Sequence, residues 1–323
     1  MTQHEGLSYA AAGVDIEAYT RMLERVRPLV AATQGPEVAT GIGPFAGLYA
    51  LPGGGHLAAS ADGVGTKIKV AIAFGRHRGI GHDLVNHCVN DVATAGARPL
   101  FLLDYFASGH LEEDVFTEVM AGLAEACREN GCALLGGETA EMPGVYALGD
   151  YDLAGFVVGL VEPGTAREPV RAGDLLVGLP SSGLHTNGFS LVRRVFEDVS
   201  LDHVYPDLGR PLGEALLEPH RSYLADLNAL PWKAAAHVTG GGLLGNVPRA
   251  LPDGLMAEID RSAWEVPAIF HLVAERGRVA DDEMVGTFNM GLGMVLVTGD
   301  PLPGLPVVGR VVEQAGAPRI RFR

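Results

Sequence analysis

The stretch Ser60-Ala61-Asp62-Gly63-Val64-Gly65-Thr66-Lys67 follows a short apolar run, Leu57 to Ala59. Its two glycines let the backbone turn tightly enough for several N–H groups to face one anion. Asp62, Thr66 and Lys67 add a metal ligand, a hydroxyl and a cation, which are the groups that bind a magnesium polyphosphate. A plain glycine turn between two strands with a solvated lysine fits the same residues, because the spacing is not that of a P-loop.

Lysine usage favours the first interpretation. The chain contains only three lysines, Lys67, Lys69 and Lys233, and two of them fall at this stretch. A compact ammonium suits a point contact with a phosphate better than a planar guanidinium does. We therefore predict that Lys67 contacts the β- or γ-phosphate of a nucleotide and that Lys69 points to solvent.

Composition limits the class of protein. A length of 323 residues suggests about two domains, and 47% hydrophobic residues with 44 glycines are typical of a soluble, loop-rich α/β enzyme. The net charge of −15 argues against nucleic acid or an anionic membrane as a partner, although local amides, one lysine and Mg²⁺ can still hold a phosphate. Cys88, Cys127 and Cys132 lack C-x-x-C spacing, so we expect reduced core thiols. No signal pattern precedes residue 13, and no apolar run approaches the roughly 20 residues of a membrane span, so we expect a cytoplasmic protein.

Apolar periodicity predicts the elements of the first half. Asp15 is placed to cap a helix that reaches Pro28. The segment 41–47 superficially matches a dinucleotide fingerprint, but Pro44 lies inside it and no helix opens after it, so we reject that site. The other expected elements are strands at 45–51, 56–59, 100–106 and 151–161, a strand or short helix at 68–74, and helices at 80–92 and 111–130.

Two further segments carry side chains that suit a nucleotide. Asn86, Asn90 and Asp91 lie off the apolar stripe of the 80–92 helix, so they either contact a phosphate or metal or form a solvated helix face. A short strand at 132–135 runs into a glycine loop at 136–143 with two carboxylates and a hydroxyl. This loop either completes a magnesium site or is an ordinary acidic surface loop.

The second half begins after a segment rich in proline, glycine and charge, 162–173, which we predict to be the domain boundary. Loops at 180–188 and 237–242 each combine a histidine, a hydroxyl and glycine ahead of an expected helix, a combination that suits an anion or a ribose. Alternatively the glycines only form turns and each histidine is structural. The expected helices are 189–196 and 243–250, and the expected strands are 174–179, 288–298 and 307–313.

Seven ordered blocks resemble one known family. They are Ser8-Tyr9 with Ala12 to Ile16, Asp62 to Lys67, Cys88 to Asp91, Leu103 to Ala107, Gly136 to Pro143, Gly183 to Gly188 and His237 to Gly242. Together they resemble the phosphoribosylformylglycinamidine cyclo-ligase family, also called aminoimidazole ribonucleotide synthetase, over nearly the whole chain. The departures are Pro44 within the 41–47 segment and a lysine-poor N-terminal region, which puts in doubt any nucleotide contact by an N-terminal lysine.

The resemblance implies an α/β (α+β) fold of two domains. Residues 1–168 would form an N-terminal ATP-binding and dimerisation domain that contributes strands to a β-barrel shared between two subunits. Residues 169–323 would form a C-terminal α+β domain that closes over the substrate. The protein would be a homodimer with no nucleic-acid or membrane partner.

The reaction implied is ATP-dependent cyclisation of formylglycinamidine ribonucleotide to 5-aminoimidazole ribonucleotide, with release of ADP and phosphate, in purine biosynthesis. Phosphoryl transfer needs mainly positioning and charge stabilisation. On this interpretation Lys67, His185 and His237 are catalytic, and Mg²⁺ is held by Asp62, Asp91 and Glu138. ATP would contact Asp62, Gly63, Val64, Gly65, Thr66, Lys67, Asn90 and Thr139. The substrate would contact Ser182, His185, Thr186, Asn187, Thr239, Gly240 and Gly241.

Other proteins of similar fold agree less well with the sequence. Selenophosphate synthetase would need a reactive cysteine before the glycine stretch, and the first cysteine here is Cys88. The hydrogenase maturation protein would end in cysteine, and the amidotransferase of the preceding purine step would be much longer. Thiamine-monophosphate kinase has the same fold. A nucleotide-binding regulatory protein without turnover would lack the carboxylates or the lysine, which are present.

Overall fold

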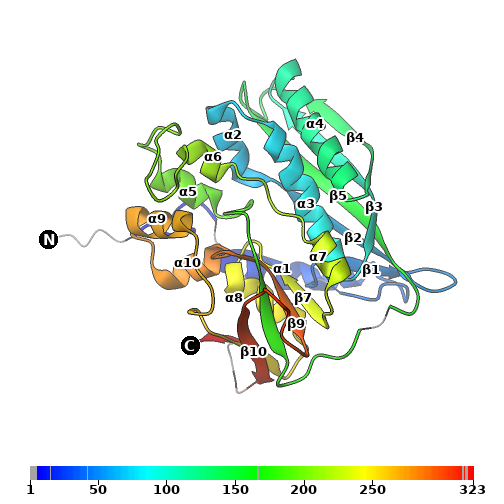
Figure 1. Cartoon of the computed structure of the whole chain (residues 1–323). Helices are drawn as coiled ribbons and strands as arrows, with labels where there is room; N and C mark the ends of the chain where they lie inside the picture. Colours follow the sequence, from blue (N-terminus) through cyan, green and yellow to red (C-terminus); the bar gives the residue numbers. More distant parts are fainter. Residues whose placement is uncertain (1–5, 15, 42, 166, 315, 317–318) are drawn as a thin grey trace.

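The computed structural model describes residues 6–14, 16–41, 43–165, 167–314, 316 and 319–323. Two sheets organise the chain, a five-stranded sheet in the first half and a six-stranded sheet in the second. Figure 1 shows the first sheet and its helices in the upper part of the view and the second sheet in the lower part. The helix α1 (Ile16–Ala31) precedes both sheets.

The first sheet has the strand order β1-β2-β5-β3-β4. Neighbouring strands in this sheet are antiparallel, except that β3 and β4 are parallel. The strands are β1 (Gly47–Ala50), β2 (His56–Gly63), β3 (Arg98–Ser108), β4 (Ala133–Glu141) and β5 (Tyr151–Val161). The helical elements are the 3-10 turn η1 (Gly65–Lys67), α2 (Ile68–Phe74), α3 (Arg78–Thr94) and α4 (Glu113–Glu129). Figure 1 shows α3 and α4 together on one face of this sheet.

The helices α3 and α4 approach each other closely because glycine occupies the contact on both. A Cβ at Gly81 would lie 2.3 Å from the backbone nitrogen of Leu123, and one at Gly122 would lie 1.9 Å from the carbonyl oxygen of Arg78. Real side chains do not tolerate such distances, so α3 is held tightly between α4 and the sheet. This placement matters because α3 carries much of the polar site.

The opposite face of the first sheet is apolar and exposed in the single chain. Tyr49 is 49% exposed, Phe156 42% and Tyr105 36%, and Leu135 on the edge strand β4 is 63% exposed. A shallow hollow of about 530 Å³ lies on this face over β1, β2 and β5. Exposed apolar surface of this extent marks an interaction surface in soluble proteins.

The second sheet has the strand order β11-β8-β10-β6-β9-β7. Its strand β9 is buried at all seven positions, as expected for a strand covered on both faces. The strands are β6 (Leu175–Pro180), β7 (Ala234–His237), β8 (Leu255–Ile259), β9 (Leu292–Thr298), β10 (Val307–Glu313) and β11 (Ile320–Phe322). The helical elements are α5 (Phe189–Val195), α6 (Leu212–Leu216), α7 (Leu224–Ala229), α8 (Gly242–Asn246), η2 (Val247–Ala250), α9 (Ala268–Gly277) and α10 (Asp281–Thr287).

Most elements that were predicted from periodicity are confirmed. The strand at 151–161 matches β5, and the helices at 80–92 and 111–130 correspond to α3 and α4. The ambiguous segment 68–74 is the helix α2, and α1 continues through Pro28 to Ala31. The proposed cap Asp15 lies outside the described residues.

Two predicted loops are wrong. Asp62 and Gly63 are the last residues of β2, and only Gly65 to Lys67 form a turn. The segment 136–143 is not a glycine loop, because residues through Glu141 continue β4 in parallel register with β3.

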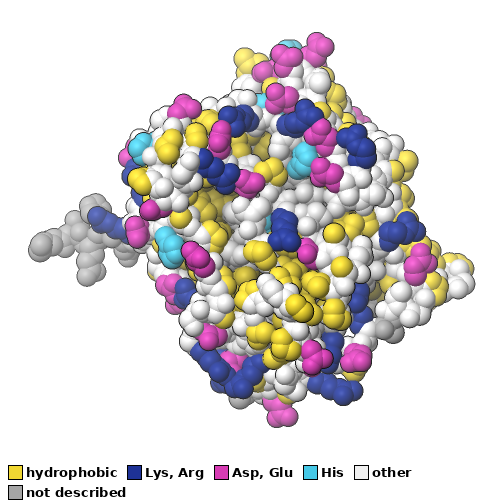
Figure 2. All heavy atoms as spheres, in the orientation of Figure 1, with side chains coloured by type: hydrophobic (Ala, Val, Ile, Leu, Met, Phe, Trp, Pro, Cys, Tyr) yellow, Lys and Arg dark blue, Asp and Glu magenta, His cyan; other side chains and the backbone are white. Residues whose placement is uncertain are grey.

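The surface carries both signs of charge. Figure 2 shows basic side chains interspersed with acidic ones over the visible face. None of the helices in the described part of the chain combines the length and apolar character that a membrane crossing requires.

Candidate active site

Three of the predicted segments meet where the two sheets and their helices adjoin. The Thr66 hydroxyl lies 3.2 Å from the Ser190 hydroxyl, which joins the turn η1 after β2 to the start of α5. A Cβ at Gly240 would lie 3.1 Å from Oδ1 of Asn187, so the two glycine loops of the second half are also adjacent. The fold therefore brings together stretches that are widely separated in the sequence.

The helix α3 faces this junction with a polar stripe. Asp83, Asn86, His87, Asn90 and Asp91 recur at helical spacing, and all five are buried. From the sequence, Asn86, Asn90 and Asp91 were predicted either to contact a phosphate or metal or to form a solvated helix face. That alternative is wrong, because the second half of the chain covers this face.

Asp62 and His87 form an ion pair between the end of β2 and α3. His87 Nε2 lies 2.8 Å from Asp62 Oδ2, and the Asp62 side chain is 35% exposed. Burial acts to lower the pKa of His87, but the charges of Asp62, Asp91 and Asp83 and the hydrogen bond to Asp62 outweigh it and raise this pKa to about 9. Burial acts to raise the pKa of Asp62, but the charge and hydrogen bonds of His87 and the Gly63 amide lower it overall. At neutral pH Asp62 is a carboxylate beside an imidazolium.

Asp91 begins a second chain of hydrogen bonds. Its Oδ1 lies 2.8 Å from His237 Nδ1, and its Oδ2 accepts a bond of 2.9 Å from the Ser60 hydroxyl. His237 Nε2 lies 3.0 Å from His220 Nε2, and the rings of His220 and His185 stack at 3.9 Å. Four histidines thus share one buried cluster at the junction.

Both histidines that were predicted to act on the substrate are inside this cluster. His185 is 1% exposed and His237 is not exposed. Burial lowers the pKa of His237, opposed by Asp91, and burial with the surrounding positive charges lowers the pKa of His185 well below its usual value. Both imidazoles are neutral at neutral pH.

Lys67 does not occupy the position that the sequence predicted. Its ammonium is fully buried, 2.8 Å from Asp83 Oδ1 and 2.8 Å from the carbonyl oxygen of Glu218. Burial lowers the pKa of Lys67 and raises that of Asp83, and the attraction between the two charges opposes both shifts. The reason is the 3-10 turn η1, which directs this side chain inward toward α3 while Lys69 stays partly exposed beside Asp150. A direct contact between Lys67 and a phosphate is not compatible with this arrangement.

Glu138 and Thr139 are also remote from the junction. Across the sheet, Gly63 is opposite Ala154, Ala154 is opposite Tyr105, and Tyr105 is opposite Glu138. Neighbouring strands are about 4.8 Å apart, so Glu138 lies three strands from the end of β2. Asp62, one residue earlier, points to the helix-covered face, so it and Glu138 are on opposite faces. Within a single chain, Glu138 therefore does not converge with Asp62 and Asp91, and a magnesium site that uses all three carboxylates stays a prediction.

Asn90 has a structural role in place of the predicted nucleotide contact. It is fully buried, and its amide donates to the carbonyl oxygen of Arg221 and accepts from the backbone nitrogen of Tyr223. Ser182 likewise donates to the carbonyl oxygen of Pro219 at 2.6 Å. Both side chains connect separate parts of the chain.

The residues present fit a magnesium ion at Asp62 better than at Asp91. Mg²⁺ takes oxygen ligands and often uses one or two carboxylates together with substrate phosphates. Asp62 is ionised and partly exposed, whereas both oxygens of Asp91 already accept hydrogen bonds. His87, Asp91 and His237 place one ligand atom each within 4.8 Å of one another, but two imidazoles suit a softer metal than Mg²⁺.

Only a few of the described polar groups at the junction are accessible to a ligand. The amides of Gly63 and Val64 already donate to Asp62 Oδ1 and to the Leu153 carbonyl oxygen. Within the part of the chain that the structure describes, the amides of Gly65 and Thr66 have no such partner and can face an anion. The accessible groups come from all three predicted segments. They are Asp62, Gly65, Thr66, Asn187, Ser190, Thr239 and Gly240.

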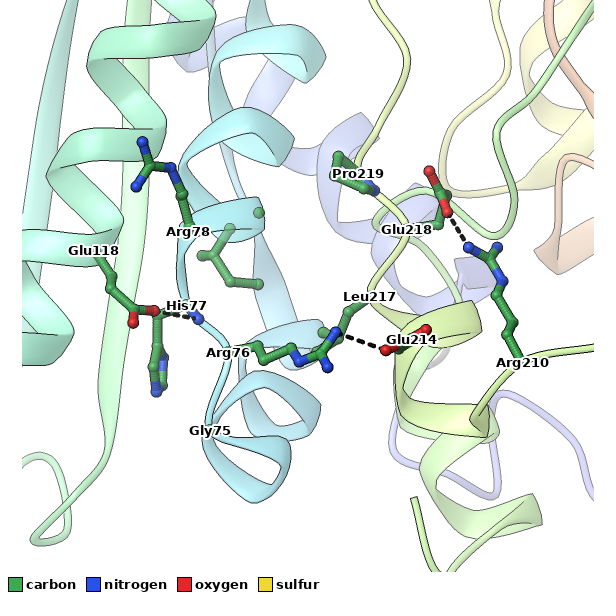
Figure 3. Close-up of a pocket in the computed structure, with 12 residues that line it drawn as sticks. Gly75, Arg76, His77, Arg78, Glu118, Arg210, Glu214, Leu217, Glu218 and Pro219 are labelled. Atoms are coloured by element: carbon green, nitrogen blue, oxygen red, sulfur yellow. Dashed lines mark hydrogen bonds and ion pairs between the residues drawn. The ribbon is translucent and has the colours of Figure 1, made fainter. Parts of the chain in front are cut away.

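The larger hollows of the single chain lie elsewhere. The cavity in Figure 3, about 470 Å³, is lined by Arg76, Arg210 and several glutamates, and each of these two arginines is already paired with a glutamate. A second cavity, about 540 Å³, lies beside Lys69 and Ser190 and adjoins the Thr66 turn. Of the accessible polar groups at the junction, only Ser190 lines either cavity, so the site follows from the residues and not from cavity size.

The sequence did not predict three members of the cluster, which are Asp83, His87 and His220. A signal for the first two was present, because Asp83, His87 and Asp91 recur every four residues on one face of a predicted helix. His220 lies in the irregular segment between α6 and α7, where no local pattern indicates a partner.

Comparison with family models assigns both halves of the chain. Residues 43–161 match the AIR synthase related protein, N-terminal domain, and residues 171–303 match the AIR synthase related protein, C-terminal domain. The chain is thus one of the two-domain AIR synthase related proteins, and the matched residues include the whole first sheet and four strands of the second, β6 to β9.

Close relatives narrow the assignment. The phosphoribosylformylglycinamidine cyclo-ligase of Myxococcus xanthus is 54% identical over 305 residues, which is 90% of this chain and 88% of that protein. The enzyme of the same name from Sorangium cellulosum is 51% identical over the same shares of both chains. The chain belongs to the phosphoribosylformylglycinamidine cyclo-ligase family.

Solved structures of lower identity share the fold. Thiamine monophosphate kinase from Aquifex aeolicus is 16% identical with a TM-score of 0.62, over 98% of this chain and 97% of that one. The hydrogenase maturation protein HypE from E. coli is 20% identical with a TM-score of 0.58, over 94% and 93%. A ThiL structure complexed with AMPPCP and TMP reaches a TM-score of 0.63 at 16% identity, over 99% and 96%.

Proposed function

We propose that the chain catalyses the ATP-dependent ring closure of formylglycinamidine ribonucleotide to 5-aminoimidazole ribonucleotide, with release of ADP and phosphate. The observation that carries this proposal is identity of 54% over 90% of the chain to a phosphoribosylformylglycinamidine cyclo-ligase. Relatives with this name are ligases of purine biosynthesis, and the match covers 90% of this chain and 88% of the relative.

The chemistry has two steps. The formyl oxygen attacks the γ-phosphorus of ATP, so that an O–P bond forms, the bond to the β-phosphate oxygen breaks, and ADP leaves. The amidine nitrogen then attacks the activated carbon, and the C–O bond breaks with inorganic phosphate as the leaving group. Such transfers depend mainly on positioning and on stabilisation of the phosphoryl charge.

The accessible groups of the junction are suited to this work. Mg²⁺, when bound, would neutralise the negative charge of the phosphates. Asp62 is the carboxylate that fits it, and the amides of Gly65 and Thr66 can face phosphate oxygens. Asn187 and Thr239 are the accessible polar side chains for the ribonucleotide, and the neutral histidines behind them position the surrounding groups.

The cellular setting of the enzyme is part of the proposal. We place it in the cytoplasm, as a homodimer with Mg²⁺ and ATP as required small molecules. The exposed apolar face of the first sheet, which includes Tyr105 and Phe156, supports the dimer because a second copy of this face would cover it.

One assay tests the activity. Purified protein is incubated with Mg²⁺-ATP, with and without formylglycinamidine ribonucleotide, and ADP and the aminoimidazole product are measured separately. We expect both products in equal amounts and only when the ribonucleotide is present. Release of ADP with thiamine monophosphate, and not with the ribonucleotide, would instead assign the kinase activity of the structural neighbour.

A further inference from the structure

His220 lies at the centre of the histidine cluster, although it comes from an irregular part of the chain. It belongs to the segment 218–223 between α6 and α7, and its side chain is 1% exposed. Because the segment has no regular secondary structure there, other parts of the molecule must fix its position.

Three side chains of α3, which we call the α3 clamp, bind the backbone of this segment. Asp83 Oδ1 accepts the backbone N–H of His220 at 2.7 Å, and Asn86 Nδ2 donates to the His220 carbonyl oxygen at 2.7 Å. Asn90 donates to the carbonyl oxygen of Arg221 and accepts the backbone N–H of Tyr223. Both backbone polar groups of His220 are therefore held by the other half of the chain.

The opposite side of the segment is less well packed. Figure 3 shows Leu217, Glu218 and Pro219 as one wall of the cavity of about 470 Å³. Arg76 and Glu214 form an ion pair at 2.9 Å in the same cavity, across the two halves of the chain. The α3 clamp supplies the hydrogen bonds to the backbone of His220 itself. Lys67 and Ser182 bind the carbonyl oxygens of the two preceding residues, 218 and 219.

The hydrogen bonds assign the protons of the cluster. Asp91 Oδ1 can only accept, so His237 Nδ1 carries a proton in their bond of 2.8 Å. His237 is neutral, so its Nε2 holds a lone pair and His220 Nε2 must donate across the 3.0 Å between them. The remaining nitrogen of His220, Nδ1, is then unprotonated, and it has no hydrogen-bond partner among the residues described.

We propose that His220 is a positioning residue for the cyclo-ligase reaction, an inference that rests on the proposed function. Its Nε2–H group fixes the ring of His237, and His237 fixes Oδ1 of Asp91. The hydroxyl of Ser60 fixes Oδ2 of the same carboxylate. Both carboxylate oxygens of Asp91 are thereby fixed in direction. Asp91 lies one helical turn after His87, and His87 is the ion-pair partner of the accessible Asp62. Catalytic groups need such support, because small losses of orientation reduce the rate.

The proton assignment is tested by nitrogen NMR on the whole protein with labelled histidine. We expect His220 to carry its proton on Nε2 and His237 on Nδ1, both protected from exchange with water. A proton on His220 Nδ1 would reverse the bond to His237 and overturn the proposal. This measurement does not depend on which reaction the enzyme catalyses.

The kinetics of two His220 variants test whether this residue positions the catalytic groups. Loss of a group that orients a ligand typically costs about 10- to 100-fold, so His220→Leu should lower kcat by about that factor while KM for ATP stays near the parent value. His220→Gln, whose amide N–H can also donate to His237, should recover most of the loss. His271→Gln, at an exposed position on α9, is the matched control and should behave as the parent.

The outcomes are distinct. Parent-like kcat in a folded His220→Leu variant, or equal losses in the Leu and Gln variants, would overturn the positioning role. If the Leu variant does not fold, the Gln variant and the NMR assignment decide. A parent enzyme without turnover of the ribonucleotide overturns the proposed function instead, and with it the kinetic role, while the NMR result still decides the hydrogen bond.

Discussion

The ammonium of Lys67 lies 2.8 Å from Oδ1 of Asp83, and neither side chain is exposed to solvent. The same carboxylate oxygen accepts the backbone N–H of His220, and the same ammonium donates to the Glu218 carbonyl. One buried ion pair thus connects the turn after β2, the helix α3 and the segment that carries His220. The lysine of the glycine stretch joins the two halves of the molecule.

Replacing Lys67 should therefore destabilise the fold. Lys67→Met leaves the Asp83 carboxylate buried without its counterion, and breaking a buried pair in this way costs about 3–5 kcal/mol of the free energy of unfolding. Urea denaturation measures this loss. The double variant Lys67→Met with Asp83→Asn should recover part of it, since the neutral amide still accepts the His220 N–H.

Lys69→Met is the matched control for this experiment. Lys69 is 42% exposed and pairs with Asp150 at the surface, so its loss should change the free energy of unfolding by less than about 0.5 kcal/mol. Parent-like stability of Lys67→Met together with lost activity would show that the ammonium acts on a phosphate after all.

Asp62 should carry the magnesium dependence. Removal of one preorganised charge contact typically lowers kcat by about 10²–10³, so we expect a loss of this size in Asp62→Asn, with a higher Mg²⁺ concentration for half-maximal rate. Steady-state kinetics over a range of Mg²⁺ concentrations measure both quantities.

Glu138→Gln provides the comparison, because Glu138 lies on the other face of the sheet, three strands away. Its Mg²⁺ concentration for half-maximal rate should equal that of the parent. An equal shift in both variants would mean that a second chain completes the metal site.

Local patterns predicted most of the elements but not the edge of the first sheet. Helices α3 and α4 and the strand β5 each pack an apolar face against the first core, so their apolar residues recur with a clear period. The strand β4 is exposed at most positions and contains Gly136 and Gly137, so nothing in its sequence alternates. Its strand character comes from parallel pairing with β3, which no local window of sequence reveals.

The sequence located the site but not its internal contacts. Segments around Asp62, Asn187 and Thr239 were predicted to act together, and the fold brings them to one junction. The burial of Lys67 and the role of His220 depend on the segment 218–223 crossing α3. That crossing is a tertiary contact between distant stretches, and side-chain types alone do not indicate it.

Stability should fall in mild acid because of buried neutral histidines. The pKa of His185 is well below its usual value, chiefly through burial, and positive charges on neighbouring groups add to the shift. As pH falls below about 6.5, the unfolded chain takes up a proton that folded His185 does not, so the free energy of unfolding falls by up to about 1.4 kcal/mol per pH unit. The neighbouring groups that are charged at neutral pH are Lys67, His87 and Arg221, and His237 adds to the shift once it is protonated.

Denaturation of variants between pH 7 and pH 5 isolates this contribution. His185 has a φ of 60°, which asparagine tolerates, so His185→Asn should unfold with a shallower pH dependence than the parent. His271→Asn, at an exposed site, should keep the parent slope. Identical slopes in all three proteins would show that His185 is protonated in the folded state.

The exposed face of the first sheet should form a dimer. Tyr105 and Phe156 lie on this face, 36% and 42% exposed in the single chain, and a second copy would bury them. A charge at such a position must be desolvated on association, so Phe156→Lys should weaken the dimer by at least about tenfold, or 1.4 kcal/mol. Val204→Lys, at an exposed apolar residue of the second half, is the control and should leave the dimer intact. Light scattering at several protein concentrations measures the mass, and an active parent enzyme with the mass of one chain would exclude the dimer.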